Sequence, residues 1–253
     1  MKLSVLAMFF ALSIGHAWAQ RIAPDILPTG KGPLTIQPIQ HASLVLTINK
    51  KTIYADPSGS AALYQGIDAP DMIVITDIHG DHFDTATLRA ILRPNTILVV
   101  PPAVADKLPA SEKANLVILK NGDQAVKMGV TIRAIPMYNL PETADSKHPK
   151  GRGNGYVLTI GGKNIYLSGD TQGIPEMRAL KNIDLAFVCM NLPYTMDVPE
   201  AADAVLAFKP AIVYPYHYRG QNGFSDTNAF KKLVDAGNKG IEVRLRNWYA
   251  AGR

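Results

Sequence analysis

The sequence contains a single cysteine, Cys189, in 253 residues. No intramolecular disulfide can therefore stabilise the fold, and we expect this thiol, inside an apolar run at residues 185–189, to be a small buried hydrophobic group. Charged residues are also few, at 19%, whereas apolar residues make up 47%. This balance excludes an intrinsically disordered chain and is typical of globular proteins.

Long apolar runs are missing as well, which excludes a polytopic membrane protein. The apolar run at residues 3–14 is shorter than the roughly 20 residues that cross a bilayer. It follows Lys2 and precedes Ala17-Trp18-Ala19, an order typical of a cleavable secretory signal peptide. We predict a signal peptide over residues 1–19 and a single domain over residues 20–253. The protein would then be periplasmic or secreted, without a stable membrane anchor after cleavage; a buried N-terminal helix is the alternative.

A concentrated basic segment is also absent. The formal net charge is +5 and the isoelectric point is near 9.2, but the lysines and arginines are scattered along the chain. We therefore expect no nucleic-acid partner and instead a small-molecule substrate. No Gly-x-Ser-x-Gly motif is present to indicate a serine nucleophile.

One segment of the sequence occurs twice. Residues 45–54 and 157–166 are identical at seven of ten positions, at a constant offset of 112. Each segment predicts a β-hairpin, with alternating apolar residues around a two-residue turn at Asn49-Lys50 or Gly161-Gly162. Each hairpin ends near an acidic residue, Asp56 or Asp170.

The elements that follow the two hairpins come in the same order. Short buried strands are predicted at residues 72–75 and 184–188, helices at 84–92 and 199–208, and further buried strands at 96–100 and 211–214. The sequence thus predicts an α/β fold, a four-layer αββα sandwich built from two similar halves. A site would lie where strand ends of both halves meet. Residues 140–154 lack periodicity and predict a surface loop.

Four candidate metal ligands occur within residues 77–82, directly after a predicted buried strand. They are Asp77, His79, Asp81 and His82. Imidazole and carboxylate groups are ligands suited to zinc and similar divalent ions. Asp84 is a suitable helix N-cap, but capping does not account for two histidines in this segment.

Further candidate ligands follow other predicted strands. His217 follows the strand at 211–214, Asp170 follows the second hairpin, and His148 lies in the predicted loop. Because the two halves are similar, these positions correspond to strand ends that face the same site. We therefore predict a metal site to which both halves contribute.

This ligand series, Asp77-x-His79-x-Asp81-His82 followed by His148, Asp170 and His217, resembles that of the metallo-β-lactamase-fold hydrolases. The similarity extends over residues 34–248. Five segments are similar, more narrowly, to the branch that resembles L-ascorbate-6-phosphate lactonase: Gln40-His41-Ala42-Ser43, Tyr54-Ala55-Asp56-Pro57, His148-Pro149-Lys150-Gly151, Ser168-Gly169-Asp170-Thr171 and Tyr214-Pro215-Tyr216-His217-Tyr218. The resemblance implies a two-metal hydrolase. In it, His79 and His148 would bind the first metal, Asp81, His82 and His217 the second, and Asp170 would bridge them.

Asp77 departs from the family pattern, which has a histidine at this position. A carboxylate is a shorter and harder ligand than imidazole, so Asp77 either binds the first metal or leaves that site weak. We therefore expect one or two divalent ions. Zn²⁺ is the expected metal, and Mn²⁺ or Fe²⁺ is favoured if Asp77 is a ligand.

The metal set and the resemblance together predict hydrolysis of a lactone, ester or phosphodiester bond by a metal-activated water. Asp81 and His41 are the candidate catalytic residues, Asp81 for orienting the water and His41 for proton transfer or substrate contact. Asp56 is expected to support the metal ligands.

Lys150, Arg152 and Tyr218 are the candidate substrate contacts. The two cations would favour an anionic substrate, although a solvated loop is the alternative for them. Lys147 beside His148 and Arg219 near His217 are further candidates for the pocket wall.

Two other functions fit parts of the sequence. Export would suit a periplasmic β-lactamase, but Cys189 does not lie in a ligand motif, and Asp170 resembles the lactonase and phosphodiesterase branches instead. The other possibility is a non-catalytic metal-binding or ligand-binding protein in which Asp77 marks a degraded first site.

Overall fold

The computed structural model of the protein describes residues 21–143 and 145–249. The predicted signal peptide, residues 1–19, lies outside the described residues. Within the described part of the chain, every helix is too short or too polar to traverse a lipid bilayer.

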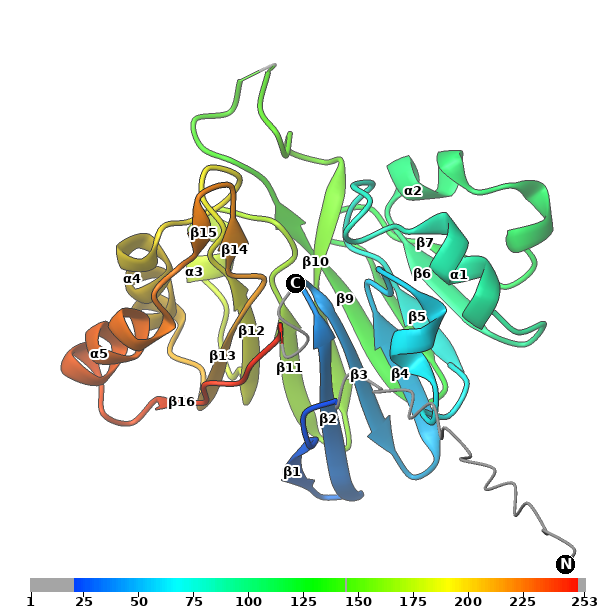
Figure 1. The fold of residues 1–253 in the computed structure, drawn as a ribbon, viewed down its shortest axis with the longest axis horizontal. Coiled ribbons are helices and arrows are strands. Elements are labelled where there is room, and N and C mark those ends of the chain that lie inside the picture. The colour runs from blue at the N-terminus through cyan, green and yellow to red at the C-terminus, as the bar shows by residue number, and fades with distance from the viewer. Residues whose placement is uncertain (1–20, 144, 250–253) are drawn as a thin grey trace, which may run out of the picture.

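Two seven-stranded sheets form the centre of the fold (Figure 1). The strands of the first sheet, in spatial order, are β1 (Asp25–Thr29), β2 (Gly32–Gln40), β3 (Ser43–Ile48), β4 (Lys51–Ala55), β5 (Met72–Val74), β6 (Ile97–Val100) and β7 (Leu116–Ile118). The strands of the second are β16 (Glu242–Val243), β13 (Ile212–Tyr216), β12 (Leu185–Cys189), β11 (Lys163–Leu167), β10 (Gly153–Ile160), β9 (Val130–Met137) and β8 (Gln124–Lys127). A separate small hairpin joins β14 (Arg219–Gly220) to β15 (Gly223–Phe224).

The two sheets repeat one pairing pattern. In the first sheet, β1 to β4 pair antiparallel, and β4 to β7 pair parallel. In the second sheet, β8 to β11 pair antiparallel, and β11, β12, β13 and β16 pair parallel. The prediction of two similar halves is therefore confirmed.

Helices cover the outer faces of the two sheets. α1 (Thr85–Ile91) and α2 (Pro102–Lys107) lie on the side of the first sheet, and α3 (Pro175–Arg178), α4 (Val198–Phe208) and α5 (Thr227–Gly237) on the side of the second (Figure 1). Short 3₁₀ helices occupy Ala61–Tyr64 and Ala110–Glu112. The predicted four-layer αββα arrangement is confirmed.

The hairpin turns show why the repeated segments fold alike. Both turns connect their strands with two residues, between Ile48 and Lys51 and between Ile160 and Lys163. All four turn residues have positive φ: 49° and 61° at Asn49 and Lys50, and 59° and 84° at Gly161 and Gly162. This conformation suits the right-handed twist of the flanking strands, and Asn and Gly adopt it readily.

Alternation along the strands separates two hydrophobic layers. In β3, Leu44 and Leu46 belong to the large cluster that also contains residues of the second sheet, whereas Val45 packs with α1 and α2 on the outer face. β5 behaves in the same way, with Met72 and Val74 inside and Ile73 outside. Successive side chains of a strand point to opposite faces, so strands such as β3 and β5 contribute to both layers.

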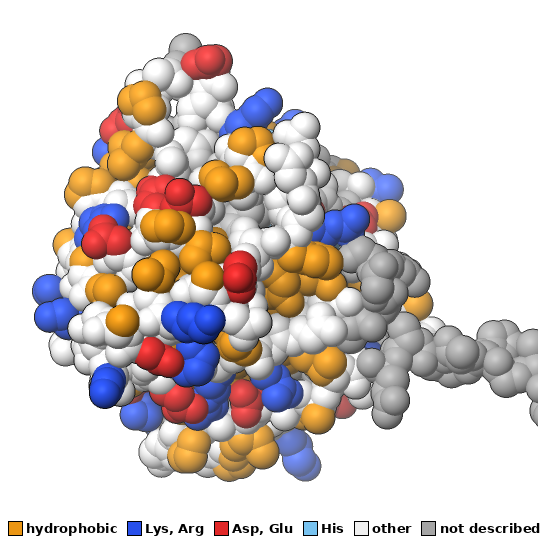
Figure 2. Space-filling model, turned by 60° about the vertical axis from the view of Figure 1, so that its left-hand side comes forward, with side chains coloured by type: hydrophobic (Ala, Val, Ile, Leu, Met, Phe, Trp, Pro, Cys, Tyr) orange, Lys and Arg blue, Asp and Glu red, His pale blue; other side chains and the backbone are white. Residues whose placement is uncertain are grey.

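Cys189 is free and fully buried in the larger cluster, as predicted. On the face that Figure 2 presents, lysine and arginine side chains are scattered among acidic and apolar ones. On this face, the lysines and arginines are thus as scattered as they are along the sequence.

The predicted boundaries differ from the structure by a few residues. Asp84 is the N-cap of α1, as expected, and its carboxylate accepts hydrogen bonds from the backbone of Ala86 and Thr87. The predicted loop at 140–154 ends earlier than expected, because β10 already begins at Gly153, which pairs with Met137.

Candidate metal centre

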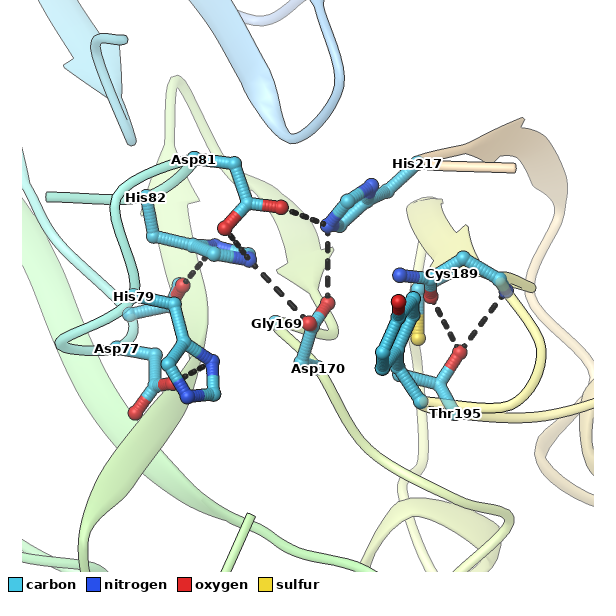
Figure 3. Close-up of polar contacts among 12 residues, drawn as sticks. Asp77, His79, Asp81, His82, Gly169, Asp170, Cys189, Thr195 and His217 are labelled. Carbon is cyan, nitrogen blue, oxygen red and sulfur yellow. Dashed lines mark hydrogen bonds and ion pairs between the residues drawn. The ribbon is translucent and has the colours of Figure 1, made fainter. Parts of the chain in front are cut away.

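Most of the candidate ligands follow the carboxyl ends of strands in the parallel parts of the two sheets. The segment 76–82 comes after β5, Asp170 comes after β11, and His217 directly follows β13. Carboxyl ends of parallel strands commonly form binding sites, and here such ends of both sheets contribute ligands. Figure 3 shows the side chains of Asp81, His82, Asp170 and His217 converging from these separate elements.

Asp170, His82 and His217 form a fully buried group. Nε2 of His82 lies 3.4 Å from Oδ2 of Asp170, and Nε2 of His217 lies 3.4 Å from Oδ1 of the same carboxylate. One ligand atom of each residue lies within 4.8 Å of the others, so the three atoms can surround a single cation. We call these three residues the buried triad.

Several polar atoms of this region have no hydrogen-bond partner among the described residues. They are Nε2 of His82, Nε2 of His148, both ring nitrogens of His217 and Oδ1 of Asp170. Buried polar atoms are almost always hydrogen-bonded, and the exceptions call for a physical reason. Imidazole nitrogens and a carboxylate oxygen that converge in this way fit a divalent ion.

Electrostatics favours a charged Asp170. Burial raises the pKa of this carboxyl group, but the imidazoles of His217 and His82 outweigh burial and hold the pKa well below its usual range. An anionic carboxylate at the centre of the site therefore attracts a cation.

Asp56 determines which nitrogen of His82 faces the site. Its Oδ1 accepts a hydrogen bond from the backbone of Thr76 at 2.7 Å, and its Oδ2 accepts one from the Thr76 hydroxyl at 2.6 Å. Nδ1 of His82 lies 2.8 Å from the same Oδ2. A carboxylate only accepts, so Nδ1 donates its proton to Asp56 and Nε2 is the ring nitrogen that faces Asp170.

Asn139 orients His148 in a similar way. Its side-chain oxygen accepts hydrogen bonds from the backbone N–H of His148 at 2.8 Å and from the ring Nδ1 at 3.1 Å. Nε2 of His148 therefore points to Asp170 Oδ2, at 3.2 Å. Sequence reasoning missed Asn139, and nothing in its surrounding residues signals this role.

Asp77, His79 and His148 form a second group of possible ligands. Oδ2 of Asp77 lies 2.9 Å from Nδ1 of His79 (Figure 3). Asp77 is fully buried, and the guanidinium of Arg152 donates to both of its oxygens, at 3.0 and 2.8 Å. Arg152, a predicted substrate contact, thus lies within the protein's own ion pair.

Asp81 and His41 lie on the solvent side of the buried triad. Oδ2 of Asp81 is 3.2 Å from His217 Nε2, and the Asp81 side chain is 40% exposed. The ring of His41 lies 5.4 Å from that of His217, and its Nδ1 is 3.3 Å from the hydroxyl of Tyr249. Burial lowers the pKa of His41 to about 4, and the neighbouring His217 adds to this effect, so the ring is neutral at pH 7.

Three of the eight described non-glycine residues with positive φ lie in the same region. His41, Asp56 and His217 have φ values of 44°, 43° and 45°, a left-handed conformation that is uncommon outside glycine. The backbone N–H of His217 donates to the carbonyl oxygen of His41 at 3.1 Å, which ties two of these positions together. Strain of this kind, about 1–3 kcal/mol per residue, often accompanies functional sites.

A cavity of about 440 Å³ opens beside the metal centre. Its wall is formed by His41, His79, Asp81, Lys147, His148, Asp170, Asn191, Tyr194, Arg219 and Gly220. Asn191 and Tyr194 were not identified from the sequence, because the segment that carries them contains no motif.

Lys150 and Tyr218, two of the three predicted substrate contacts, do not form part of this wall. Lys150 lies 3.3 Å from Glu142 and from Glu176, and it covers the ring of Tyr138. Tyr218 is buried against Phe224 and Tyr249. The structure therefore places both side chains among other protein groups.

Comparison with known proteins identifies relatives of the whole domain. The model of the β-lactamase superfamily domain matches residues 35–217. A UPF0173 metal-dependent hydrolase of Thermococcus onnurineus is 32% identical over 216 residues, which cover 81% of this chain and 93% of that protein. A UPF0173 metal-dependent hydrolase of Thermus thermophilus is 29% identical over 212 residues, covering 80% and 91%.

Solved structures show the same similarity. A candidate metal-dependent hydrolase of Parabacteroides distasonis is 38% identical and superposes with a TM-score of 0.76, covering 88% of this chain and 97% of that one. A metallo hydrolase of Ignicoccus hospitalis shares the fold, with a TM-score of 0.70 at 22% identity, over 85% of this chain and 95% of that one.

The role of Asp56 can be tested with Asp56→Asn. The asparagine side chain has the same shape, but its NH₂ group would donate to Nδ1 of His82 and move the ring proton to Nε2, where it blocks metal binding. We expect metal affinity to fall about 10- to 100-fold, the usual effect of losing such a supporting carboxylate. Isothermal titration with Zn²⁺ measures the change. Asp71→Asn, which alters a carboxylate at the opposite end of β5 that accepts from Thr52, is the control, and equal losses in both variants would contradict the assignment.

Proposed function

Because the chain belongs to the metallo-β-lactamase superfamily of metal-dependent hydrolases, we propose that it hydrolyses a lactone, ester or phosphodiester bond in a small anionic molecule. The observation that carries this proposal is the buried triad, whose imidazole and carboxylate atoms include several without a hydrogen-bond partner among the described residues. Its carboxylate, Asp170, lines the cavity. Such a set would hold a divalent ion, for which Zn²⁺ is our first candidate.

The ion would supply two things, a water with its pKa lowered towards 7 and a positive charge that polarises the substrate oxygen. His82, Asp170 and His217 would hold it. Asp81 is half-exposed at the cavity wall, where its carboxylate can orient a water and receive its proton. His41, neutral at pH 7, is available in the same wall for contact with the substrate.

Lys147 and Arg219 support an anionic substrate. Both line the cavity. Lys150 and Arg152 are paired with acidic side chains, whereas neither Lys147 nor Arg219 forms an ion pair with a described residue. An unpaired cation in a cavity wall attracts a phosphate or carboxylate group, and arginine can bind it through two parallel hydrogen bonds.

Two finer assignments accompany this proposal. The segments around His41, His148 and His217 favour the branch that resembles L-ascorbate-6-phosphate lactonase. The pattern of residues 1–19 favours export to the periplasm or the medium.

If the leader is removed, N-terminal sequencing of protein from the periplasm or the medium will begin near Gln20. A mature chain that retains Met1 would contradict export by this route.

Metal-dependent turnover tests the proposed reaction. We expect the purified protein to hydrolyse at least one member of a panel of lactones, esters and phosphodiesters. Chelation should abolish this activity and added Zn²⁺ or Mn²⁺ should restore it. His82→Ala should reduce kcat by at least a hundredfold, because it removes a nitrogen that would hold the ion.

The same panel separates the alternative functions. Hydrolysis of nitrocefin, with no turnover of the other substrates, would identify a β-lactamase. Metal binding without any turnover would identify a binding protein, and either result would overturn the proposal.

The preference for an anionic substrate can be tested with Arg219→Ala. Losing a charge-assisted hydrogen bond should raise KM for a phosphate-bearing or carboxylate-bearing substrate roughly tenfold, with KM for a matched neutral ester unchanged. Lys150→Ala is the control, because Lys150 is paired with Glu142 and Glu176 outside the cavity wall. Equal effects of Arg219→Ala on charged and neutral substrates would count against the proposed contact.

A further inference from the structure

The ion pair between Arg152 and Asp77 lies where a metal ligand would be expected. Nε of Arg152 donates to Oδ1 of Asp77 at 3.0 Å, and Nη2 donates to Oδ2 at 2.8 Å. The Asp77 side chain is fully buried, and that of Arg152 is 18% exposed. A two-pronged pair of this kind, largely out of water, is strong and has a defined geometry.

The backbone holds Arg152 in this position. The next residues begin β10 and run close to the segment that carries Asp77: the N–H of Asn154 donates to the carbonyl oxygen of Thr76 at 2.9 Å. A Cβ atom at Gly153 would lie 2.8 Å from that same oxygen and 3.2 Å from Oδ1 of Asp77. Only glycine permits this approach, which holds the backbone directly after Arg152 against the segment that carries Asp77.

Arg152 contacts two of the three members of the Asp77–His79–His148 group. Besides its contact with Asp77, its Nη2 lies 3.4 Å from Nε2 of His79. A divalent ion held by this group would lie beside a permanent positive charge. It would also share Asp77 Oδ2 with two hydrogen-bonding neighbours, Nη2 of Arg152 and Nδ1 of His79.

The buried triad differs in this respect. Its carboxylate, Asp170, has imidazoles around it, and among the described residues no lysine or arginine forms an ion pair with it. Its Oδ1 and the facing nitrogens of His82 and His217 have no hydrogen-bond partner there. The Asp77–His79–His148 group is thus already paired with the cationic side chain of Arg152. The buried triad has no lysine or arginine paired with it among the described residues.

We propose that the Arg152 guanidinium replaces the first metal ion of a two-metal site and that this protein binds one divalent ion, at the buried triad. This explains why position 77 is an aspartate and not a histidine, because a carboxylate neutralises the arginine and an imidazole could not. The inference concerns metal content alone, so it stands apart from the substrate proposed above.

Metal stoichiometry tests this inference without an activity assay. Metal-free protein is loaded with excess Zn²⁺, freed of unbound ions by gel filtration and analysed by inductively coupled plasma mass spectrometry. We expect one ion per chain for the wild type. Asp77→His combined with Arg152→Ala removes the charge and supplies an imidazole, and we expect two ions per chain for this double variant.

Two matched variants isolate the role of the charge. Asp77→His alone keeps the guanidinium and should still bind one ion, and Lys150→Ala, which removes a neighbouring cation, should also bind one. Two ions per chain in the wild type or in Asp77→His would overturn the inference. So would a double variant that folds, by circular dichroism, and binds only one. A wild type that binds no ion would overturn both this inference and the metal-dependent reaction.

Discussion

The negative charge of Asp170 is the constraint on which the site depends. This carboxylate is buried beyond the end of β11, and one of its oxygens has no hydrogen-bond partner among the described residues. A buried charge is costly unless it is paired with an opposite charge or bound to a metal. The imidazoles of His82, His148 and His217 all direct Nε2 towards Asp170. A divalent ion held by these nitrogens and by the carboxylate would compensate this charge.

The negative charges of the other three carboxylates, Asp56, Asp77 and Asp81, are stabilised in different ways. The way in which each charge is stabilised indicates the role of the residue. Asp56 is held by Thr76 and His82, and it orients a ring that faces Asp170. Asp77 is neutralised by Arg152. Asp81 is partly exposed to water, where a charge costs little and a proton can be exchanged. Of these four carboxylates, Asp170 is the one surrounded by imidazoles, where a cation from outside the chain would be held.

Much of the fold and part of the site could be predicted from the sequence, because their causes are local. The two-residue turns and the alternating apolar residues of the flanking strands predict the hairpins. A buried strand followed by closely spaced histidines and aspartates predicts a group of metal ligands at the end of that strand. The repeated segment then indicates that residues as distant as His82 and Asp170 approach each other. The structure does bring them together.

The roles that could not be predicted depend on partners far away in the sequence. Arg152 and Asp77 are separated by 75 residues, and only the packing of β10 against the end of β5 reveals their ion pair. Lys150 lies in the same loop but turns to Glu142 and Glu176, and Tyr218 joins an aromatic cluster that includes Tyr249. A basic or aromatic residue beside a ligand is therefore no guide to whether it faces the ligand or the protein.

Anomalous diffraction from crystals grown with Zn²⁺ tests the central claim most directly. The account predicts one anomalous peak per chain, about 2.0–2.2 Å from the facing nitrogens of His82 and His217 and from an oxygen of Asp170. The guanidinium of Arg152 should remain on Asp77. A peak between Asp77 and His79, or the absence of one at the buried triad, would contradict the account.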